Sequence, residues 1–92
     1  MPQIFKVGSY VIFFWANENL PLEPVHVHIS YRIPSEVSSK VWITKSRKGL
    51  LCHNDAHIPR RLLTIILEII SSRSSEIIEK WLGFFGQIDY YC

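Results

Sequence analysis

The chain has 92 residues, which is enough for one small domain over residues 1–92 and leaves no room for a second hydrophobic core. Apolar residues make up 48% of the chain, a share that excludes an intrinsically disordered protein. The net charge of +2 at pH 7 is lower than a dedicated DNA-binding domain usually carries.

Cysteine content and hydropathy predict the compartment. Two cysteines, Cys52 and Cys92, are too few for a disulfide framework, so we expect free thiols in a reducing cytoplasm, with a single bridge as the alternative. The N-terminal stretch lacks the long apolar core of a signal peptide. No stretch approaches the roughly eighteen apolar residues of a membrane-spanning helix. These patterns predict a cytoplasmic protein without membrane contact.

The beginning of the chain is typical of a β-hairpin. Residues 3–7 and 10–17 have the composition of strands, and Gly8 followed by Ser9 suits a two-residue type II′ turn. The second of these strands is apolar on both faces. We therefore expect it at the centre of a sheet, covered on both sides.

A strand with two different faces follows a loop over residues 17–24. Apolar and polar residues alternate over 25–32, and a period of two predicts a strand with one apolar and one polar face. The polar face carries His26, His28, Ser30 and Arg32. Residues 40–44 and 50–53 have the composition of a fourth and a fifth strand, separated by a basic turn.

Two helices are predicted after the strands. Pro59 fits the first turn of a helix over residues 60–72, whose apolar side chains cover more of its circumference than one sheet would bury. We therefore expect this helix to be buried on two sides, the second facing the last helix or a partner. Ser74 or Ser75 is the expected N-cap of a helix over 76–85.

The end of the chain completes the expected fold. Gly86 suits the end of the second helix, and residues 88–92 form a short extended tail. Because the strands come first and the helices afterwards, the sequence predicts an α+β domain. It would contain a small, mostly antiparallel sheet of four to five strands followed by two C-terminal helices packed on it.

The two histidines of the alternating strand are the first candidates for a functional site. One imidazole could accept a proton and the other could donate one, while Arg32 binds a phosphate. This set is sufficient to cleave RNA at a 2′-hydroxyl without a metal. The alternative is a solvated strand face with no chemistry. We predict that His26 and His28 share one face and are at least partly accessible.

A metal site is a second interpretation of the same strand. His26 and His28 can chelate from positions i and i+2. Further ligands could come from Cys52, His53, Asp55 and His57. The spacing matches no standard metal motif, so we predict no bound metal and no cofactor.

Basic residues in the middle of the chain are candidates for nucleic-acid contact. Lysine and arginine bind phosphates without reading the base sequence, and the neighbouring Trp42 could stack on a base. The candidate residues are Lys45, Arg47, Lys48, Arg60 and Arg61, with Lys40 close by in the sequence. The alternative is a solvated charged turn, which is common.

Several short segments share their order and spacing with a known family. They are Met1-Pro2-x-Ile4, Tyr10-Val11-Ile12-Phe13-Phe14, Asn17-Glu18, Pro24-x-His26-Val27-His28 and Ile58-Pro59-x-x-Leu62. Together they resemble a widespread family of small bacterial proteins, domain of unknown function family 4160. The resemblance covers residues 1–81, and the ending 84–92 lies beyond the common pattern, as a subgroup feature.

The resemblance implies a function as well as a fold. Members of the family are often encoded beside another small protein and are described as toxin–antitoxin components. We therefore expect a cytoplasmic toxin–antitoxin component that acts through a small protein encoded nearby, or as a homo-oligomer, with RNA as a further partner. The alternatives are a metal-independent ribonuclease that uses His26 and His28, and a non-catalytic interaction module. Whether the protein is an enzyme stays open at this point.

Overall fold

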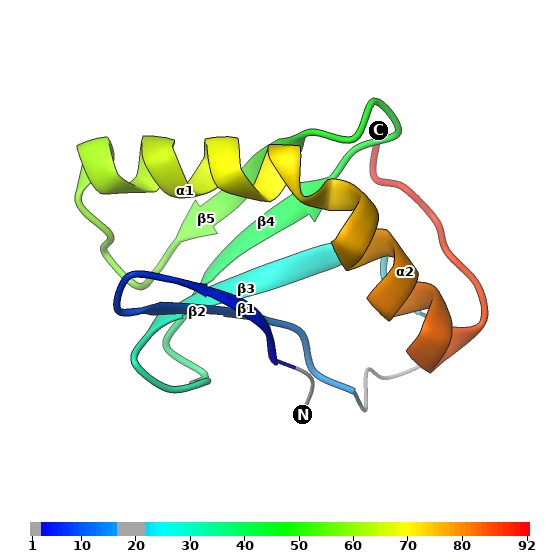
Figure 1. Cartoon of the computed structure of the whole chain (residues 1–92), viewed down its shortest axis with the longest axis horizontal. Coiled ribbons are helices and arrows are strands. Elements are labelled where there is room, and N and C mark those ends of the chain that lie inside the picture. The colour runs from blue at the N-terminus through cyan, green and yellow to red at the C-terminus, as the bar shows by residue number, and fades with distance from the viewer. Residues whose placement is uncertain (1–2, 17–21) are drawn as a thin grey trace.

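The computed structural model describes residues 3–16 and 22–92. Within these residues the chain forms five strands and then two helices (Figure 1). Their bounds are β1 (Gln3–Val7), β2 (Tyr10–Phe13), β3 (His26–Tyr31), β4 (Ser39–Ile43), β5 (Gly49–Asn54), α1 (Arg60–Ser72) and α2 (Ser74–Phe85). The predicted α+β architecture is therefore confirmed.

The strands form one antiparallel sheet in which each strand pairs with the next along the chain. β2 ends at Phe13, earlier than predicted, and Asn17 lies outside the described residues. The expectation that both faces of this strand are covered is confirmed, because Val11, Ile12 and Phe13 have no exposed surface. Gly8 has a φ of 58°, as the first position of the predicted turn requires.

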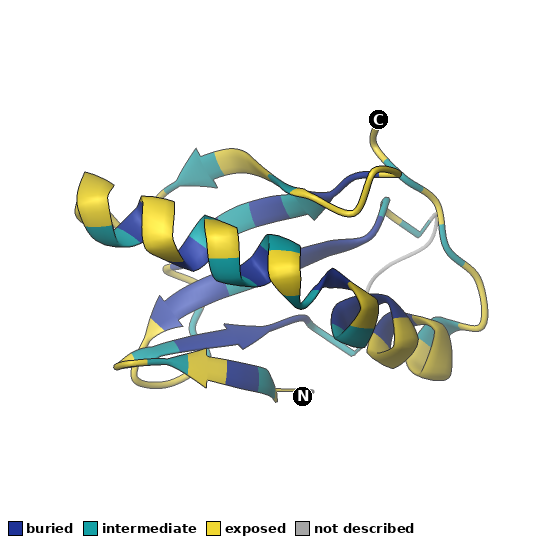
Figure 2. Cartoon of the chain, turned by 45° about the horizontal axis from the view of Figure 1, so that its top comes forward, coloured by how far each residue is buried: buried dark blue, intermediate teal, exposed yellow. Residues whose placement is uncertain are grey.

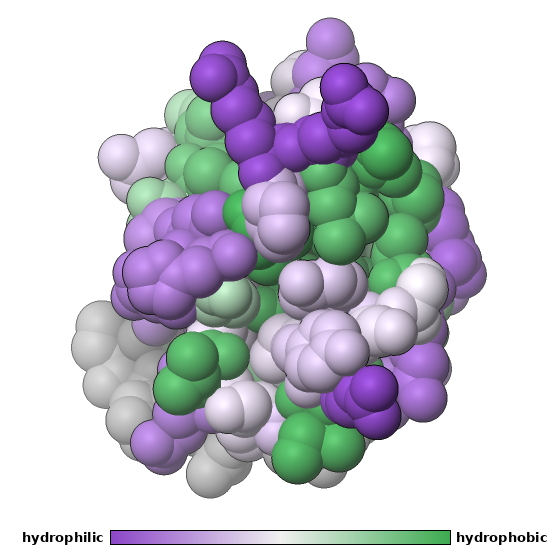
Figure 3. Space-filling view, turned by 90° about the vertical axis from the view of Figure 1, so that its left-hand side faces the viewer, coloured by the Kyte–Doolittle hydropathy of each residue, from purple (hydrophilic) through white to green (hydrophobic). Residues whose placement is uncertain are grey.

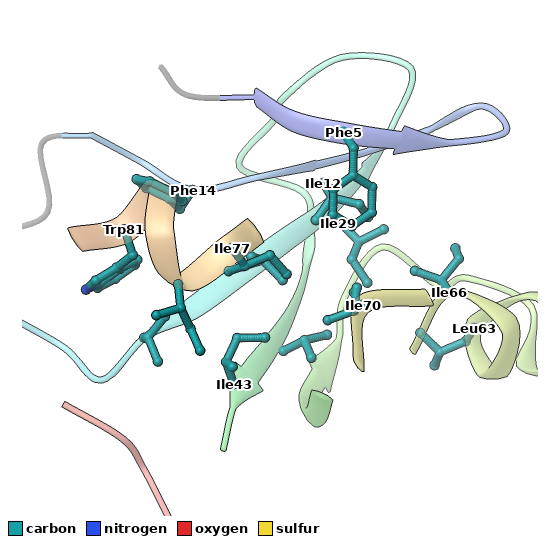
Figure 4. Close-up of a cluster of buried hydrophobic side chains, with 14 of the residues drawn as sticks. Phe5, Ile12, Phe14, Ile29, Ile43, Leu63, Ile66, Ile70, Ile77 and Trp81 are labelled. Atoms are coloured by element: carbon teal, nitrogen blue, oxygen red, sulfur yellow. The ribbon is translucent and has the colours of Figure 1, made fainter. Parts of the chain in front are cut away.

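Both helices lie on the same side of the sheet (Figures 1 and 2). Helix α1 lies over β4 and β5, and α2 continues from the end of α1 toward β1. Apolar side chains from strands and helices meet between these two layers (Figure 4). The central members of this core are Phe5, Ile12, Phe14, Ile29, Ile43, Leu63, Ile66, Ile70, Ile77 and Trp81. Each fully buried aliphatic side chain contributes about 1.5–3 kcal/mol relative to exposure, so this layer is the main source of stability.

Helix α1 has the predicted bounds but a different environment. Its buried residues Leu63, Ile66 and Ile70 form one stripe that faces the sheet, whereas Ile65 is 46% exposed. The expectation that the last helix covers the second side is wrong, because α2 continues past the end of α1 instead of lying beside it (Figure 2), and cover by a partner stays a prediction. The outer part of the apolar arc therefore stays at the surface.

The end of α1 approaches the sheet closely at Gly49. A Cβ atom at this position would lie 3.2 Å from Cγ2 of Ile70 and 3.2 Å from Cγ1 of Val41, both buried. The Gly49 N–H donates to Oγ of Ser71 at 2.9 Å, and this hydroxyl donates to the Leu67 carbonyl. The absence of a side chain at Gly49 thus lets the last turns of the helix pack on β5.

Helix α2 begins at Ser74, two residues before the predicted start. Its N-cap is Arg73 and not Ser74 or Ser75, and no side chain caps the helix. Arg73 forms a bidentate ion pair with Glu76 and lies 3.8 Å from the ring centre of Phe5, so it supports the first turn by other contacts. Gly86 ends the helix with a φ of 70°, as predicted.

We predict that Ile70→Ala lowers the free energy of unfolding by about 2–5 kcal/mol, because it leaves a cavity in the core between α1 and the sheet. Ile65→Ala is the matched control on the same helix, and its effect should stay below about 1 kcal/mol since this side chain is 46% exposed. Urea denaturation measures both. Equal losses in the two variants would contradict the described orientation of α1.

Candidate functional site

The polar residues of β3 lie on the sheet face opposite the helices. Val27 and Ile29 belong to the helix-covered core, so the alternation turns His26 and His28 to the other face. The prediction that the two histidines share a face is confirmed. The prediction of accessibility is wrong for His26, which is 1% exposed, and right for His28, which is half-buried.

His26 is enclosed by aromatic rings. Its ring centre lies 5.0 Å from that of His28, 5.3 Å from that of Trp81 and 5.8 Å from that of Trp42. Nδ1 donates a hydrogen bond to the Pro24 carbonyl oxygen at 2.9 Å. Because these groups shield the ring from solvent, His26 has the environment of a structural residue.

His28 has a fixed orientation and an unusually low pKa. Its Nδ1 lies 3.1 Å from Oγ of Ser38, and its ring stacks on Phe13 at 5.4 Å. Burial lowers the pKa of His28 to about 4, with further lowering by the positive charges of His26, Lys40 and His53. His28 is therefore a neutral imidazole at pH 7.

Lys40 lies opposite His28 on the neighbouring strand β4. Its Nζ forms an ion pair with Glu23 and lies 4.4 Å from the ring centre of Trp42. The hydrogen bond from Lys40 lowers the pKa of Glu23, so the carboxylate stays ionised in the pair. The side chain of Lys40 is 15% exposed, and that of Glu23 is 45% exposed.

A third member of this row is His53 on β5, which the register places opposite Lys40. Its Nδ1 lies 3.3 Å from Oδ2 of Asp55, and its side chain is 40% exposed. Sequence reasoning missed the row of His28, Lys40 and His53, because it spans three strands. The sequence shows the alternation of polar and apolar residues within each strand. It does not predict the pairing between β4 and β5, because the register shifts just beyond Lys40.

The C-terminal segment, residues 86–92, packs against the same region. It runs from the end of α2 to the turn between β4 and β5 (Figure 1). The Val25 N–H donates to the Asp89 carbonyl at 2.8 Å, and the Lys45 N–H donates to the Cys92 carbonyl at 2.9 Å. Tyr91 stacks on Trp42 with ring centres 4.8 Å apart and planes within 3°, and it is still 60% exposed.

Arg32 does not join the histidines. β3 ends at Tyr31, and Arg32 has a φ of 66°, which breaks the alternation on which its predicted position depended. Its N–H donates to the Ser9 carbonyl at 2.7 Å, and its guanidinium lies 5.1 Å from the ring centre of Tyr31. The structure thus places Arg32 beside the turn between β1 and β2.

The predicted basic residues fall into two separate groups. Lys45, Arg47 and Lys48 are exposed in the turn between β4 and β5, where Arg47 donates to Oγ of Ser75. Arg60 and Arg61 are exposed at the other end of α1, roughly 20 Å away for a helix of this length. Figure 3 shows this second end, where hydrophilic and hydrophobic side chains alternate over the surface.

The residues considered as metal ligands are not gathered. Within 3–16 and 22–92, no group of three or more His, Cys, Asp or Glu side chains is placed to hold a metal ion. Cys52 and Cys92 are both free thiols and exposed.

A known protein family matches most of the chain. The model of a domain of unknown function, DUF4160, matches residues 9–82. The chain belongs to this family. The match includes β2 to β5, α1 and most of α2, and leaves out the C-terminal segment with Tyr91.

No curated protein and no solved structure matches the chain. None of the helices in the described part of the chain has the length and apolar character needed to span a membrane.

We predict that His28 makes stability depend on pH. The unfolded chain binds a proton on this residue near its ordinary pKa of 6.5, whereas the folded chain binds it only near pH 4. Below pH 6.5 the unfolded state therefore binds more protons, and stability falls as the pH decreases toward 4. In His28→Asn this part of the decrease should be absent, as urea denaturation at several pH values would measure.

Nuclear magnetic resonance provides a direct check on the same property. The imidazole proton resonances of His28 should titrate with a midpoint near pH 4. A midpoint near the ordinary histidine value would mean that the ring is solvated in the folded protein, against its described burial.

Proposed function

We propose that this protein is a cytoplasmic toxin–antitoxin component that binds single-stranded RNA on the sheet face opposite its helices and acts together with a small protein encoded nearby. The toxin–antitoxin role rests on the family resemblance, and we propose that the segment after residue 82 marks a subgroup within the family. RNA binding rests on one observation, which is the exposed stack of Tyr91 on Trp42 beside the Lys40 side chain.

The stack has the features of a binding platform for an unpaired base. One face of the Tyr91 ring is covered by Trp42, and the side chain remains 60% exposed, so its other face is open to a ligand. Proteins bind single-stranded nucleic acids by stacking bases on aromatic rings and pairing phosphates with cations. A base on Tyr91 would extend an existing stack without moving a core residue.

One lysine side chain contacts this platform, and two more lysines lie in the turn to which the C-terminal segment is hydrogen-bonded. Lys40 contacts Trp42, and the backbone of Lys45 is hydrogen-bonded to Cys92, the residue after Tyr91. Lys48 is exposed in the same turn as Lys45. The modest net charge of +2 favours this local arrangement over a broad duplex-binding surface, because duplex binding usually requires many phosphate contacts.

Catalysis by His26 and His28, the alternative function, has less support from the geometry. A general acid or base must come within hydrogen-bonding distance of the proton that it transfers. His26 is 1% exposed and surrounded by rings, so it has no route to a 2′-hydroxyl group. Arg32 does not complete that set, because its backbone is hydrogen-bonded to Ser9 in the turn between β1 and β2, away from the two histidines.

We predict that Tyr91→Leu weakens the binding of a short 2′-O-methyl RNA by at least about fivefold, because stacking contributes about 1–3 kcal/mol per base. Leucine keeps Trp42 covered but removes the flat ring. Tyr91→Phe should bind like the wild type, and so should Tyr31→Leu, which alters an aromatic residue that is 53% exposed elsewhere on the surface. Fluorescence anisotropy measures the affinities, and equal binding by Tyr91→Leu and Tyr91→Phe would refute the platform.

We predict that the outer side of α1 contributes to a subunit or partner interface. Ile65 is 46% exposed there, and Leu62 and Ile69 are only half-buried. Sedimentation velocity at high concentration should detect a species larger than the monomer, either alone or with the co-expressed neighbouring protein. Ile65→Glu should shift it to the monomer, and a monomer under every condition would disprove the interface.

A further inference from the structure

We infer that His28, Lys40 and His53 form a catalytic site for metal-independent cleavage of single-stranded RNA, and this inference rests on the proposed RNA binding. In this assignment His28 is the general base, Lys40 the cation that binds the phosphate, and His53 the general acid. The site differs from the pair predicted from the sequence, because the second imidazole comes from β5 and not from the same strand.

The register of the sheet places the three side chains in a row. His28 pairs with Lys40, and Lys40 pairs with His53, so all three lie on the face opposite the helices. Directly opposed residues in an antiparallel sheet have Cβ atoms about 5 Å apart, which puts the two imidazoles roughly 10 Å apart at Cβ. A phosphodiester lying along this row would reach both imidazoles, and the Lys40 ammonium group would move to it from its present place beside Glu23 and the Trp42 ring.

His28 has the properties of the base. Oγ of Ser38 lies 3.1 Å from Nδ1, and when Nδ1 donates to this hydroxyl, Nε2 carries the lone pair. Burial and the neighbouring positive charges lower the pKa of His28 to about 4, so the ring is unprotonated at neutral pH. A base must be unprotonated before it can accept the proton of the 2′-hydroxyl.

His53 has the properties of the acid. Its Nδ1 is shielded from solvent and lies 3.3 Å from the Asp55 carboxylate, while the side chain as a whole is 40% exposed. The edge of the ring that carries Nε2 is thus the one available to a substrate. The nearby carboxylate would stabilise the ring in the form that donates a proton.

Lys40 forms an ion pair with Glu23 that a substrate would have to replace. The carboxylate that pairs with its ammonium group is 45% exposed, and an RNA phosphate can replace it without disturbing the core. Lys40 would then neutralise the charge that develops on the phosphate oxygens in the transition state. It follows that Glu23 competes with substrate for Lys40.

The reaction balances with these three residues alone. The 2′-oxygen forms a bond to the adjacent phosphorus as its proton moves to Nε2 of His28. The bond from phosphorus to the 5′-oxygen breaks, and this oxygen keeps the electron pair and takes a proton from Nε2 of His53. The products are a 2′,3′-cyclic phosphate and a 5′-hydroxyl, and exchange with solvent returns the proton that His53 lost and removes the one that His28 gained.

The test separates cleavage from binding. A single-stranded RNA of mixed sequence is incubated with the protein and a chelator, alone and with the co-expressed neighbouring protein, and the product ends are identified by mass spectrometry. Binding is measured in parallel on the 2′-O-methyl RNA, which has no nucleophilic hydroxyl. We expect cleavage that leaves cyclic phosphate ends and does not occur on DNA of the same sequence.

The variants assign the roles. His53→Gln and His28→Asn should each lower the cleavage rate roughly a hundredfold or more and leave binding nearly unchanged. His57→Gln is the matched control, because His57 is an exposed histidine in the loop after β5, and it should cleave like the wild type. Glu23→Gln should increase the affinity for RNA severalfold, since it frees Lys40. Should His28→Asn fail to fold, His53→Gln at the sheet edge still decides the outcome.

Three results would overturn the inference. Wild-type protein that binds the 2′-O-methyl RNA but cleaves no RNA under any of these conditions would exclude the catalytic site and leave RNA binding in place. Equal cleavage by wild type and His53→Gln would exclude the assigned acid. A wild type that neither binds nor cleaves would refute the proposed function together with the site that depends on it.

Discussion

The structure depends on a central strand that is buried on one face and largely buried on the other. β3 pairs with β2 and β4, and its apolar face, with Val27 and Ile29, supplies the core under the helices. On its polar face His26 and Ser30 are buried as well, so their polar groups need hydrogen-bond partners, since an unsatisfied buried group costs about 1–3 kcal/mol. His26 donates to the Pro24 carbonyl, and Ser30 donates to the Ile33 carbonyl. The loops and the C-terminal segment therefore have to pack on this second face.

Hydrophobic periodicity was sufficient to predict the architecture. It located the strands and α1, and it assigned the two faces of β3 correctly. Successive side chains of a strand point to opposite faces, so once the apolar residues are placed on the core face the others must lie on the opposite face. Hydrophobic periodicity failed to predict burial where contacts between distant segments determine it. The aromatic cover on His26 comes from Trp81 in a distant helix, and the two-sided burial expected for α1 required a neighbour that α2 does not provide.

The candidate site was harder to predict than the fold for a related reason. Lys40 and His53 meet His28 only through strand register, which depends on turn lengths and on irregularities in the ladder. Arg32 was misplaced by the same logic, because extrapolating the alternation by one residue ignored the left-handed backbone that ends β3. What the chain shows directly is which residues share a strand face. Which residues of neighbouring strands lie side by side is known only from the structure.

The register shift in β5 has a consequence for solubility. β5 is an edge strand with Leu50, Leu51 and Cys52 exposed, and it carries no charged residue between Gly49 and Cys52. Exposed edges of this composition recruit further strands and lead to aggregates. The extra residue, Cys52, lies between the paired positions Leu51 and His53 and interrupts the regular row of backbone groups. An incoming strand would find only short regular stretches to pair with, so we expect the inserted residue to make this apolar edge a poorer template for aggregation.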